Sequence, residues 1–159
     1  NEDCLRETMR SVGGDLPKQF VYIGQMTSID ITLQEEAVLE ALRRMCGHPD
    51  PPTAIYTSSD ELAELVYLLL GRLGRRVPDD ISLMGFGDIH REGAMLSRIT
   101  SVVIDEANIG RRAVELLSQM CTGKRPLDDE ETTFVPLSLS EGRTLGPAPR
   151  LVQEAACAT

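Results

Sequence analysis

Two aspartates, Asp60 and Asp88, occupy the positions best suited to chemistry. Each closely follows a short apolar run with the length and composition of a buried strand, Thr53–Thr57 and Ile81–Met84. Carboxylates at the carboxyl ends of neighbouring parallel strands can act in acid–base catalysis, bind Mg²⁺ or accept a phosphoryl group. Each aspartate also has a structural alternative. Ser-Ser-Asp before an apolar-periodic segment is a helix-capping pattern, and an aspartate after a strand can stabilise a turn or contact a ligand.

The serine and histidine side chains that could react do not form a recognisable catalytic motif. Neither Ser58 nor Ser59 lies in a G-x-S-x-G elbow, and no partner can be assigned to His90. A phospho-acceptor domain needs an acidic pocket near its first strand, whereas no acidic residue directly follows Ile23-Gly24. We therefore predict that the chain is not an enzyme and binds no cofactor.

The cysteines predict neither a metal site nor a disulfide framework. They are widely separated and lack metal-ligand spacing. We expect four reduced thiols, at Cys4, Cys46, Cys121 and Cys157.

The elements that must position these residues alternate between helices and strands. Apolar periodicity predicts helices over Glu2–Val12, Thr32–Met45, Asp60–Leu73 and Glu106–Cys121, the last capped by Asp105. Strands are predicted over Phe20–Ile23, Thr53–Thr57, Ile81–Met84, Thr100–Ile104 and Thr133–Leu139. This alternation favours an α/β fold with a parallel sheet and helices on both faces.

Charge and length narrow the class of protein further. The chain has 159 residues, and its 16 basic and 25 acidic residues give a net charge of −9. Such a domain repels a phosphate backbone, so we expect that it does not itself contact DNA. No apolar run is long enough for a membrane span, and the start at Asn1 indicates a piece of a longer protein.

Four segments in order resemble the lactose-repressor (LacI/GalR) family. Gly74-Arg-Arg-Val-Pro-Asp-Asp-Ile-Ser-Leu-Met-Gly-Phe-Gly-Asp88 resembles that family's G-x-x-V-P-x-D-x-S-x-x-G-F-D-D segment. Upstream, Pro52–Ala63 is similar to P-T-A-I-x-x-x-N-D-x-x-A. Downstream, Ile99–Val102 is similar to L-T-T-V, and Ile109–Leu117 to G-x-x-A-x-x-L-L.

The resemblance implies a two-lobed, periplasmic-binding-protein-like fold (type I) whose chain crosses between lobes three times. Residues 1–146 would form the C-terminal lobe, except that residues 105–121 would be the last helix of the N-terminal lobe, and residues 147–159 a flexible tail. Much of the N-terminal lobe would be missing. We therefore expect the helix's apolar stripe to pack on its own domain or on a second copy, because an exposed stripe is unfavourable. The stripe comprises Ala113, Val114, Leu117 and Met120.

The resemblance also implies an effector-binding site, and this sequence departs from the family's pattern there. An Asn that contacts effector hydroxyls is replaced by Ser59, and the first Asp of G-F-D-D by Gly87. A family Arg that precedes a Gly by three residues would match Arg6, but Met9 stands where that Gly should be. Losing such partners removes discrimination among sugars, so we expect an effector that is not a simple sugar, or loss of effector binding. The effector-binding residues implied are Ser59, Asp60, Gly87, Asp88, Phe86 and Arg6.

Three classes of function remain open from the sequence. The first is the ligand-sensing and oligomerisation domain of a cytoplasmic LacI-like transcriptional regulator. It would bind a small-molecule effector, reach DNA only through a missing N-terminal domain, avoid membranes and form a homodimer at full length. The second is a solute-binding protein of a transporter, and the third a small α/β phospho-acceptor or Mg²⁺-dependent enzyme using Asp60 and Asp88.

Overall fold

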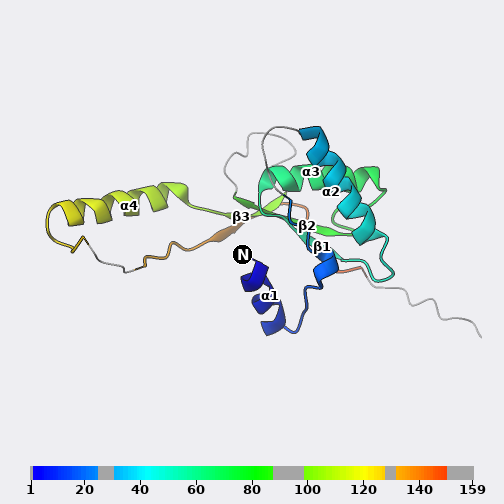
Figure 1. Ribbon diagram of the computed structural model, residues 1–159, viewed down its shortest axis with the longest axis horizontal. Coiled ribbons are helices and arrows are strands. Elements are labelled where there is room, and N and C mark those ends of the chain that lie inside the picture. Colours follow the sequence, from blue (N-terminus) through cyan, green and yellow to red (C-terminus); the bar gives the residue numbers. More distant parts are fainter. Residues whose placement is uncertain (1, 25–30, 88–98, 128–131, 150–159) are drawn as a thin grey trace, which may run out of the picture. The chain divides into compact units, whose positions relative to one another are not determined.

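The computed structural model describes residues 2–24, 31–87, 99–127 and 132–149 (Figure 1). The chain divides into two compact units. One comprises Asn1–Ile55, Leu65–Ser82 and Gly146–Thr159, and the other comprises Tyr56–Glu64 and Leu83–Leu145.

The elements alternate as an α/β fold requires. The helices are α1 (Glu2–Ser11), η1 (a 3₁₀ turn, Lys18–Phe20), α2 (Ile31–Cys46), α3 (Asp60–Arg72) and α4 (Glu106–Cys121). The strands are β1 (Ala54–Tyr56), β2 (Ser82–Gly87), β3 (Thr100–Val103) and β4 (Ser138–Ser140). The predicted fold class is confirmed as a mixed α/β fold with an open, mostly parallel sheet.

Two predicted strands differ from the structure. Phe20–Ile23 is not a strand, because the backbone N–H groups of Phe20 and Val21 bond back to Pro17 and Lys18 and close a 3₁₀ turn. The last strand is shorter than the predicted Thr133–Leu139. Only Ser138–Ser140 pairs with a neighbour, and Phe134 is 87% exposed.

In the first unit, buried residues of α2 and α3 form an apolar core. Those of α2 recur at helical spacing, which places them on one side of the helix. An ion pair between Glu35 and Arg72 also joins the two helices. The buried residues are Val38, Ala41, Leu42, Met45 and Cys46 in α2, and Val66, Leu69 and Leu70 in α3.

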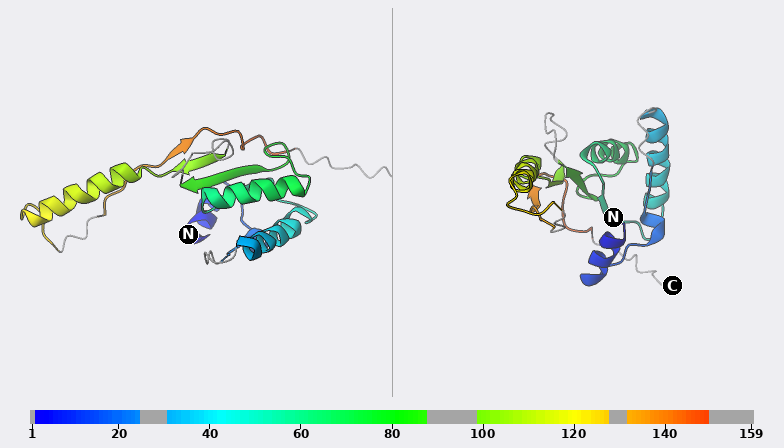
Figure 2. Two further views of the ribbon diagram at one scale, coloured as in Figure 1. Left: turned by 90° about the horizontal axis from the view of Figure 1, so that it is seen from above. Right: turned by 60° about the vertical axis from the view of Figure 1, so that its left-hand side comes forward.

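The strands follow the order β1-β2-β3-β4. In the second unit, β2 and β3 are parallel, with Gly85 opposite Ser101, and β4 is antiparallel to β3. Leu83 and Ile99 are buried there, and the backbone N–H groups of Leu83 and Thr100 both bond to the buried Thr144. The first turns of α3 lie against β2 (Figure 2).

Helix α4 begins as predicted. The first of the two arrangements predicted for its apolar stripe, packing on its own domain, is not observed in the part of the chain that the structure describes. The carboxylate of Asp105 accepts a hydrogen bond of 2.9 Å from the backbone N–H of Asn108, so Asp105 caps the helix. No residue of α4 is buried, and Val114 and Leu117 are 68% and 60% exposed. The described residues therefore do not show the stripe packed on its own domain.

Candidate functional site

The candidate site lies where the parallel strands end. β1 ends at Tyr56, β2 at Gly87 and β3 at Val103, and parallel strands bring their carboxyl ends to one edge of the sheet. Ligands of open α/β folds bind at this edge. A loop of three residues, Thr57–Ser59, connects β1 to α3 at the same edge.

Hydrogen bonds connect the Thr57–Ser59 loop to β2 and to the start of α3. The backbone N–H of buried Thr57 donates to the carbonyl of Met84 at 2.9 Å, and its hydroxyl donates to the carbonyl of Ser59 at 2.9 Å. The hydroxyl of Ser59 accepts a hydrogen bond of 3.2 Å from the backbone N–H of Leu62. Ser59 is therefore the cap of α3, and the capping role considered for Asp60 belongs to its neighbour, because α3 begins at Asp60.

The carboxylate of Asp60 reaches across β2 to β3. Its Oδ1 accepts a hydrogen bond of 2.6 Å from the hydroxyl of Ser101, which is fully buried. Gly85 lies between them on β2, and a Cβ added there would overlap that oxygen and pack 3.4 Å from the Cβ of Ala63. The sequence predicted Asp60 as a site residue and placed Gly85 in the family motif, but it did not predict that Ser101 or Gly85 would contact Asp60. Their role depends on the β2–β3 register, which places them side by side.

Phe86 and Gly87, the last two residues of β2, differ in burial. Side chains alternate along a strand, so half-buried Phe86 points to the face opposite Gly85, whereas Gly87 is buried. Gly87 has φ of 120°, a backbone conformation that side chains other than glycine adopt only with strain. An aspartate at position 87 would be strained in this conformation.

The remaining predicted site residues belong to the first unit or lie outside the described residues. Arg6 belongs to the first unit, where its Nε donates to Glu2 at 2.7 Å and its guanidinium also donates to the carbonyl of Leu16. Asp88 and His90 lie outside the described residues.

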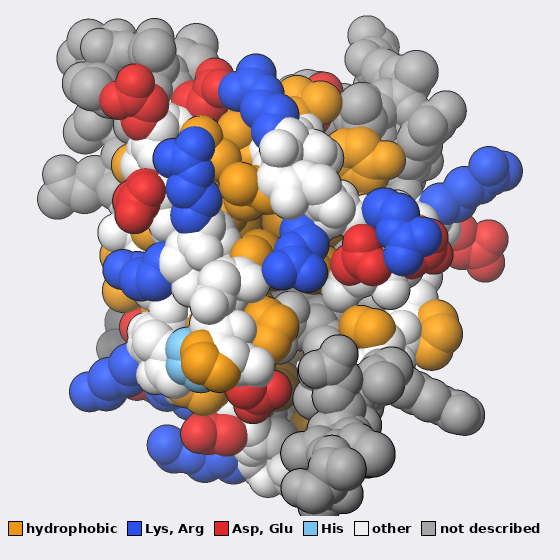
Figure 3. Space-filling view, turned by 90° about the vertical axis from the view of Figure 1, so that its right-hand side faces the viewer, with side chains coloured by type: hydrophobic (Ala, Val, Ile, Leu, Met, Phe, Trp, Pro, Cys, Tyr) orange, Lys and Arg blue, Asp and Glu red, His pale blue; other side chains and the backbone are white. Residues whose placement is uncertain are grey.

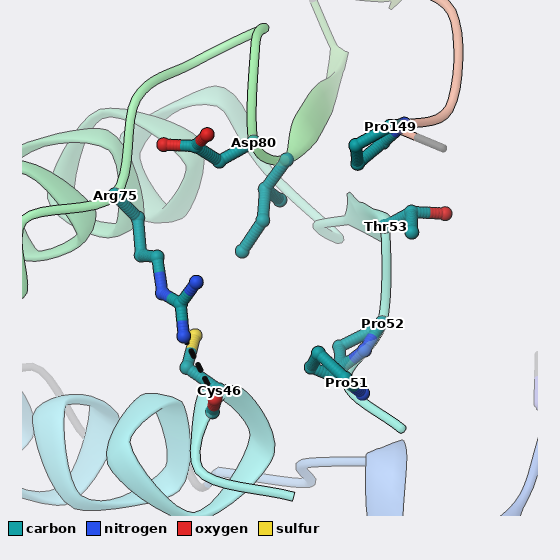
Figure 4. A pocket seen from close by; sticks show the side chains of 8 residues that line it. Cys46, Pro51, Pro52, Thr53, Arg75, Asp80 and Pro149 are labelled. Atoms are coloured by element: carbon teal, nitrogen blue, oxygen red, sulfur yellow. Dashed lines mark hydrogen bonds between the residues drawn. The ribbon is translucent and has the colours of Figure 1, made fainter. Parts of the chain in front are cut away.

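A pocket of about 190 Å³ lies at the opposite ends of the strands, within the first unit (Figure 4). Thr53 and Ile81, which line it, directly precede β1 and β2. The guanidinium of Arg75 points into it and donates to the carbonyl of Cys46 at 3.0 Å. Burial raises the pKa of the Cys46 thiol, and the charge of Arg75 opposes that rise, so this thiol is not activated as a nucleophile. Because it lies at the amino ends of the strands, this pocket is not our candidate effector site.

Asp80, beside this pocket, forms a charged pair whose effect on stability should depend on pH. Hydrogen bonds from the side chain and backbone of Arg76 lower the pKa of Asp80 from 3.8 to about 2. The pair stabilises the folded chain above pH 4, and its contribution is lost as the pH falls from about 4 to 2. We expect a small decrease in melting temperature over that range, which is smaller in high salt and in Asp80→Asn. Identical pH profiles for Asp80→Asn and the unmodified chain would contradict this. On the face shown in Figure 3, several basic side chains lie beside acidic ones.

The described part of the chain contains neither a candidate metal site nor a candidate membrane-spanning helix. Among those residues, no group of three or more His, Cys, Asp or Glu side chains could hold a metal ion. None of the described helices has the length and apolar character needed to cross a bilayer.

Comparison with known proteins identifies the family. The model of the "Periplasmic binding protein-like domain" matches residues 2–145. The chain therefore belongs to the periplasmic-binding-protein-like domain family. Within this family, the ribose operon repressor of Escherichia coli (strain K12) is 24% identical over 137 residues, covering 86% of this chain and 39% of that protein.

Two further relatives of the family are also regulators. The HTH-type transcriptional repressor PurR of Proteus mirabilis (strain HI4320) is 27% identical over 150 residues, covering 88% of this chain and 43% of that protein. A LacI family transcriptional regulator from Arthrobacter sp. FB24, solved in complex with lactose, has a TM-score of 0.59 and 27% identity over 70% of this chain and 42% of that one. The chain thus spans less than half the length of these relatives.

The resemblance to LacI-type regulators is confirmed by these relatives. These relatives are transcriptional repressors or regulators, which favours a regulator over a transporter's solute-binding protein or an enzyme.

Proposed function

We propose that this chain is the ligand-sensing and oligomerisation part of a LacI-like DNA-binding transcriptional regulator. A small-molecule effector binds at the carboxyl edge of β1–β3 and changes operator affinity through closure of two lobes. The observation that carries the proposal is the family match over residues 2–145, since relatives aligned over most of that range are transcriptional repressors.

The effector is held by a small set of residues around that edge. The hydroxyl of Ser59 accepts a bond from Leu62 but keeps its hydrogen for donation to a ligand, and half-buried Phe86 offers an apolar surface. Gly87 supplies no side chain, so the site has fewer polar groups than the family pattern and favours an effector that is not a simple sugar. The proposed contacts are Ser59, Asp60, Phe86 and Gly87, with Asp88, which follows β2 in the sequence, and Arg6 remains only what the family resemblance implies.

The exposed stripe of α4 supports the proposed domain organisation. In the full-length protein, residues 105–121 belong to the N-terminal lobe, and residues 1–146 otherwise form the C-terminal lobe, followed by a tail over 147–159. That lobe then covers Val114 and Leu117, which this chain leaves exposed. DNA is contacted only by a domain outside this acidic chain, and the regulator acts in the cytoplasm as a homodimer.

Thermal shift of the full-length protein tests the proposal. The panel contains D-ribose, lactose, sugar phosphates, nucleobases and amino acids. A bound effector at about 100 times its Kd stabilises the folded state by about 2.7 kcal/mol, which raises the melting temperature. No shift with any compound would contradict effector sensing.

The variant Ser59→Asn tests which edge of the sheet binds the effector. Asparagine also caps helices, so we expect stability to change by less than about 0.5 kcal/mol. Its amide adds a donor and an acceptor at the site, so the thermal shift with D-ribose or lactose should increase relative to the unmodified protein. As a control, Thr53→Ser alters the pocket at the opposite ends of the strands and should leave every shift unchanged. Equal shifts in the unmodified protein and Ser59→Asn would argue against this edge.

A further inference from the structure

We propose that Ser101 is a positioning residue of the effector site, an inference that rests on the proposed function. Ser101 lies on β3, away from the loop that contacts the effector. Its hydroxyl holds the carboxylate of Asp60 and, through it, the first turn of α3 and the Thr57–Ser59 loop.

The bond is well suited to this role because of its chemistry and its surroundings. A hydroxyl that donates to a carboxylate forms a charge-assisted hydrogen bond, and the 2.6 Å between Ser101 Oγ and Asp60 Oδ1 is typical of one. Ser101 is fully buried, so water does not compete for the hydroxyl. Asp60 is therefore fixed at its side chain, while Ser59 beside it fixes the backbone as the helix cap.

Gly85 supplies a second, independent observation. It pairs with Ser101 across the strands, and any Cβ at position 85 would overlap Asp60 Oδ1. The absence of a side chain on β2 thus leaves the path by which the carboxylate reaches β3. Since φ at Gly85 is not in the left-handed region, space and not backbone conformation is the reason for glycine here.

The hydrogen bond between Ser101 and Asp60 also connects the Thr57–Ser59 loop to β3, the strand that leads to α4. β3 ends at Val103 and leads through Ile104 to Asp105, the cap of α4. Ser101 therefore links the loop of the candidate site with the strand that carries α4.

Hydrogen exchange of the full-length protein tests the proposal without any ligand. The amide N–H groups of Leu62 and Ala63 bond to Ser59 and report on this cap. In Ser101→Ala we expect their exchange to accelerate about tenfold or more, because the charge-assisted bond is lost. Gly85→Ala should accelerate the same two amides, since it displaces Asp60 by another route.

Matched variants separate the hydroxyl from general packing. Ser101→Thr and Ser101→Val have nearly the same shape, and only threonine keeps the hydroxyl. Exchange at Leu62 and Ala63 should therefore be slow in Ser101→Thr and fast in Ser101→Val. This comparison tests the role of the hydroxyl even if Ser101→Ala fails to fold. Ser140→Ala removes bonds to the backbone of Ser101 but none to Asp60 among those described, so these two amides should keep their rates.

The outcomes distinguish this proposal from the proposed function. Equal exchange in the threonine and valine variants, or a uniform acceleration throughout α3 and β2, would overturn positioning by Ser101. The absence of any thermal shift would overturn effector sensing and would leave the exchange result standing. If D-ribose stabilises the unmodified protein, its Kd should rise about tenfold in Ser101→Val and stay within about twofold in Ser101→Thr, and equal Kd values would also overturn the proposal.

Discussion

Replacing Leu83 by alanine is expected to lower the free energy of unfolding by about 2–5 kcal/mol. Leu83 is fully buried on β2, on the same side of the strand as Gly85. That side faces the first turns of α3, so the cavity left by alanine would lie beneath the elements that form the candidate site. Urea unfolding followed by circular dichroism would measure the loss.

Leu139→Ala is the matched control for this prediction. Leu139 lies on β4 and is 62% exposed, so its truncation leaves no cavity and should change stability by less than about 0.5 kcal/mol. A loss below about 1 kcal/mol for Leu83→Ala, or equal losses for the two variants, would show that Leu83 is not part of a close-packed core.

Truncating Leu117 to alanine is expected to have very different effects in two contexts. In the full-length regulator, where we propose that the upstream lobe covers α4, the change should cost about 2–5 kcal/mol. In the 159-residue chain the side chain is 60% exposed, so the change should stay within about 0.5 kcal/mol. Paired urea unfolding of both proteins measures the difference.

Val114→Ala and Gln119→Ala complete this experiment. Val114 is 68% exposed on the same apolar stripe and should repeat the pattern of Leu117 on a smaller scale. Gln119 is exposed on α4 but is not part of the stripe, so its variant should be neutral in both proteins. Equal effects of Leu117→Ala in the two contexts would contradict a covering lobe. Gel filtration of the 159-residue chain would then show whether a second copy covers the stripe instead.

Much of the fold could be predicted because its signals are local. The apolar spacing of α2 and α3, the Asp105 cap and the short apolar run before Gly85 each act within a few residues of sequence. Phe20–Ile23 shows the limit of such signals. High β-propensity predicts a strand there, but a strand forms only where a neighbour accepts its hydrogen bonds, and a 3₁₀ turn was formed instead.

By itself, the sequence determined the class of fold, the family resemblance and the edge of the sheet where Ser59 and Asp60 lie. Only the tertiary structure decided what those residues do. Ser59, and not Asp60, caps α3, and Asp60 instead bonds to Ser101, 41 residues away. That bond depends on the register of two parallel strands and on the space above Gly85. The spacing of residues along the chain specifies neither the strand register nor the space above Gly85, because both arise only when distant segments pack together.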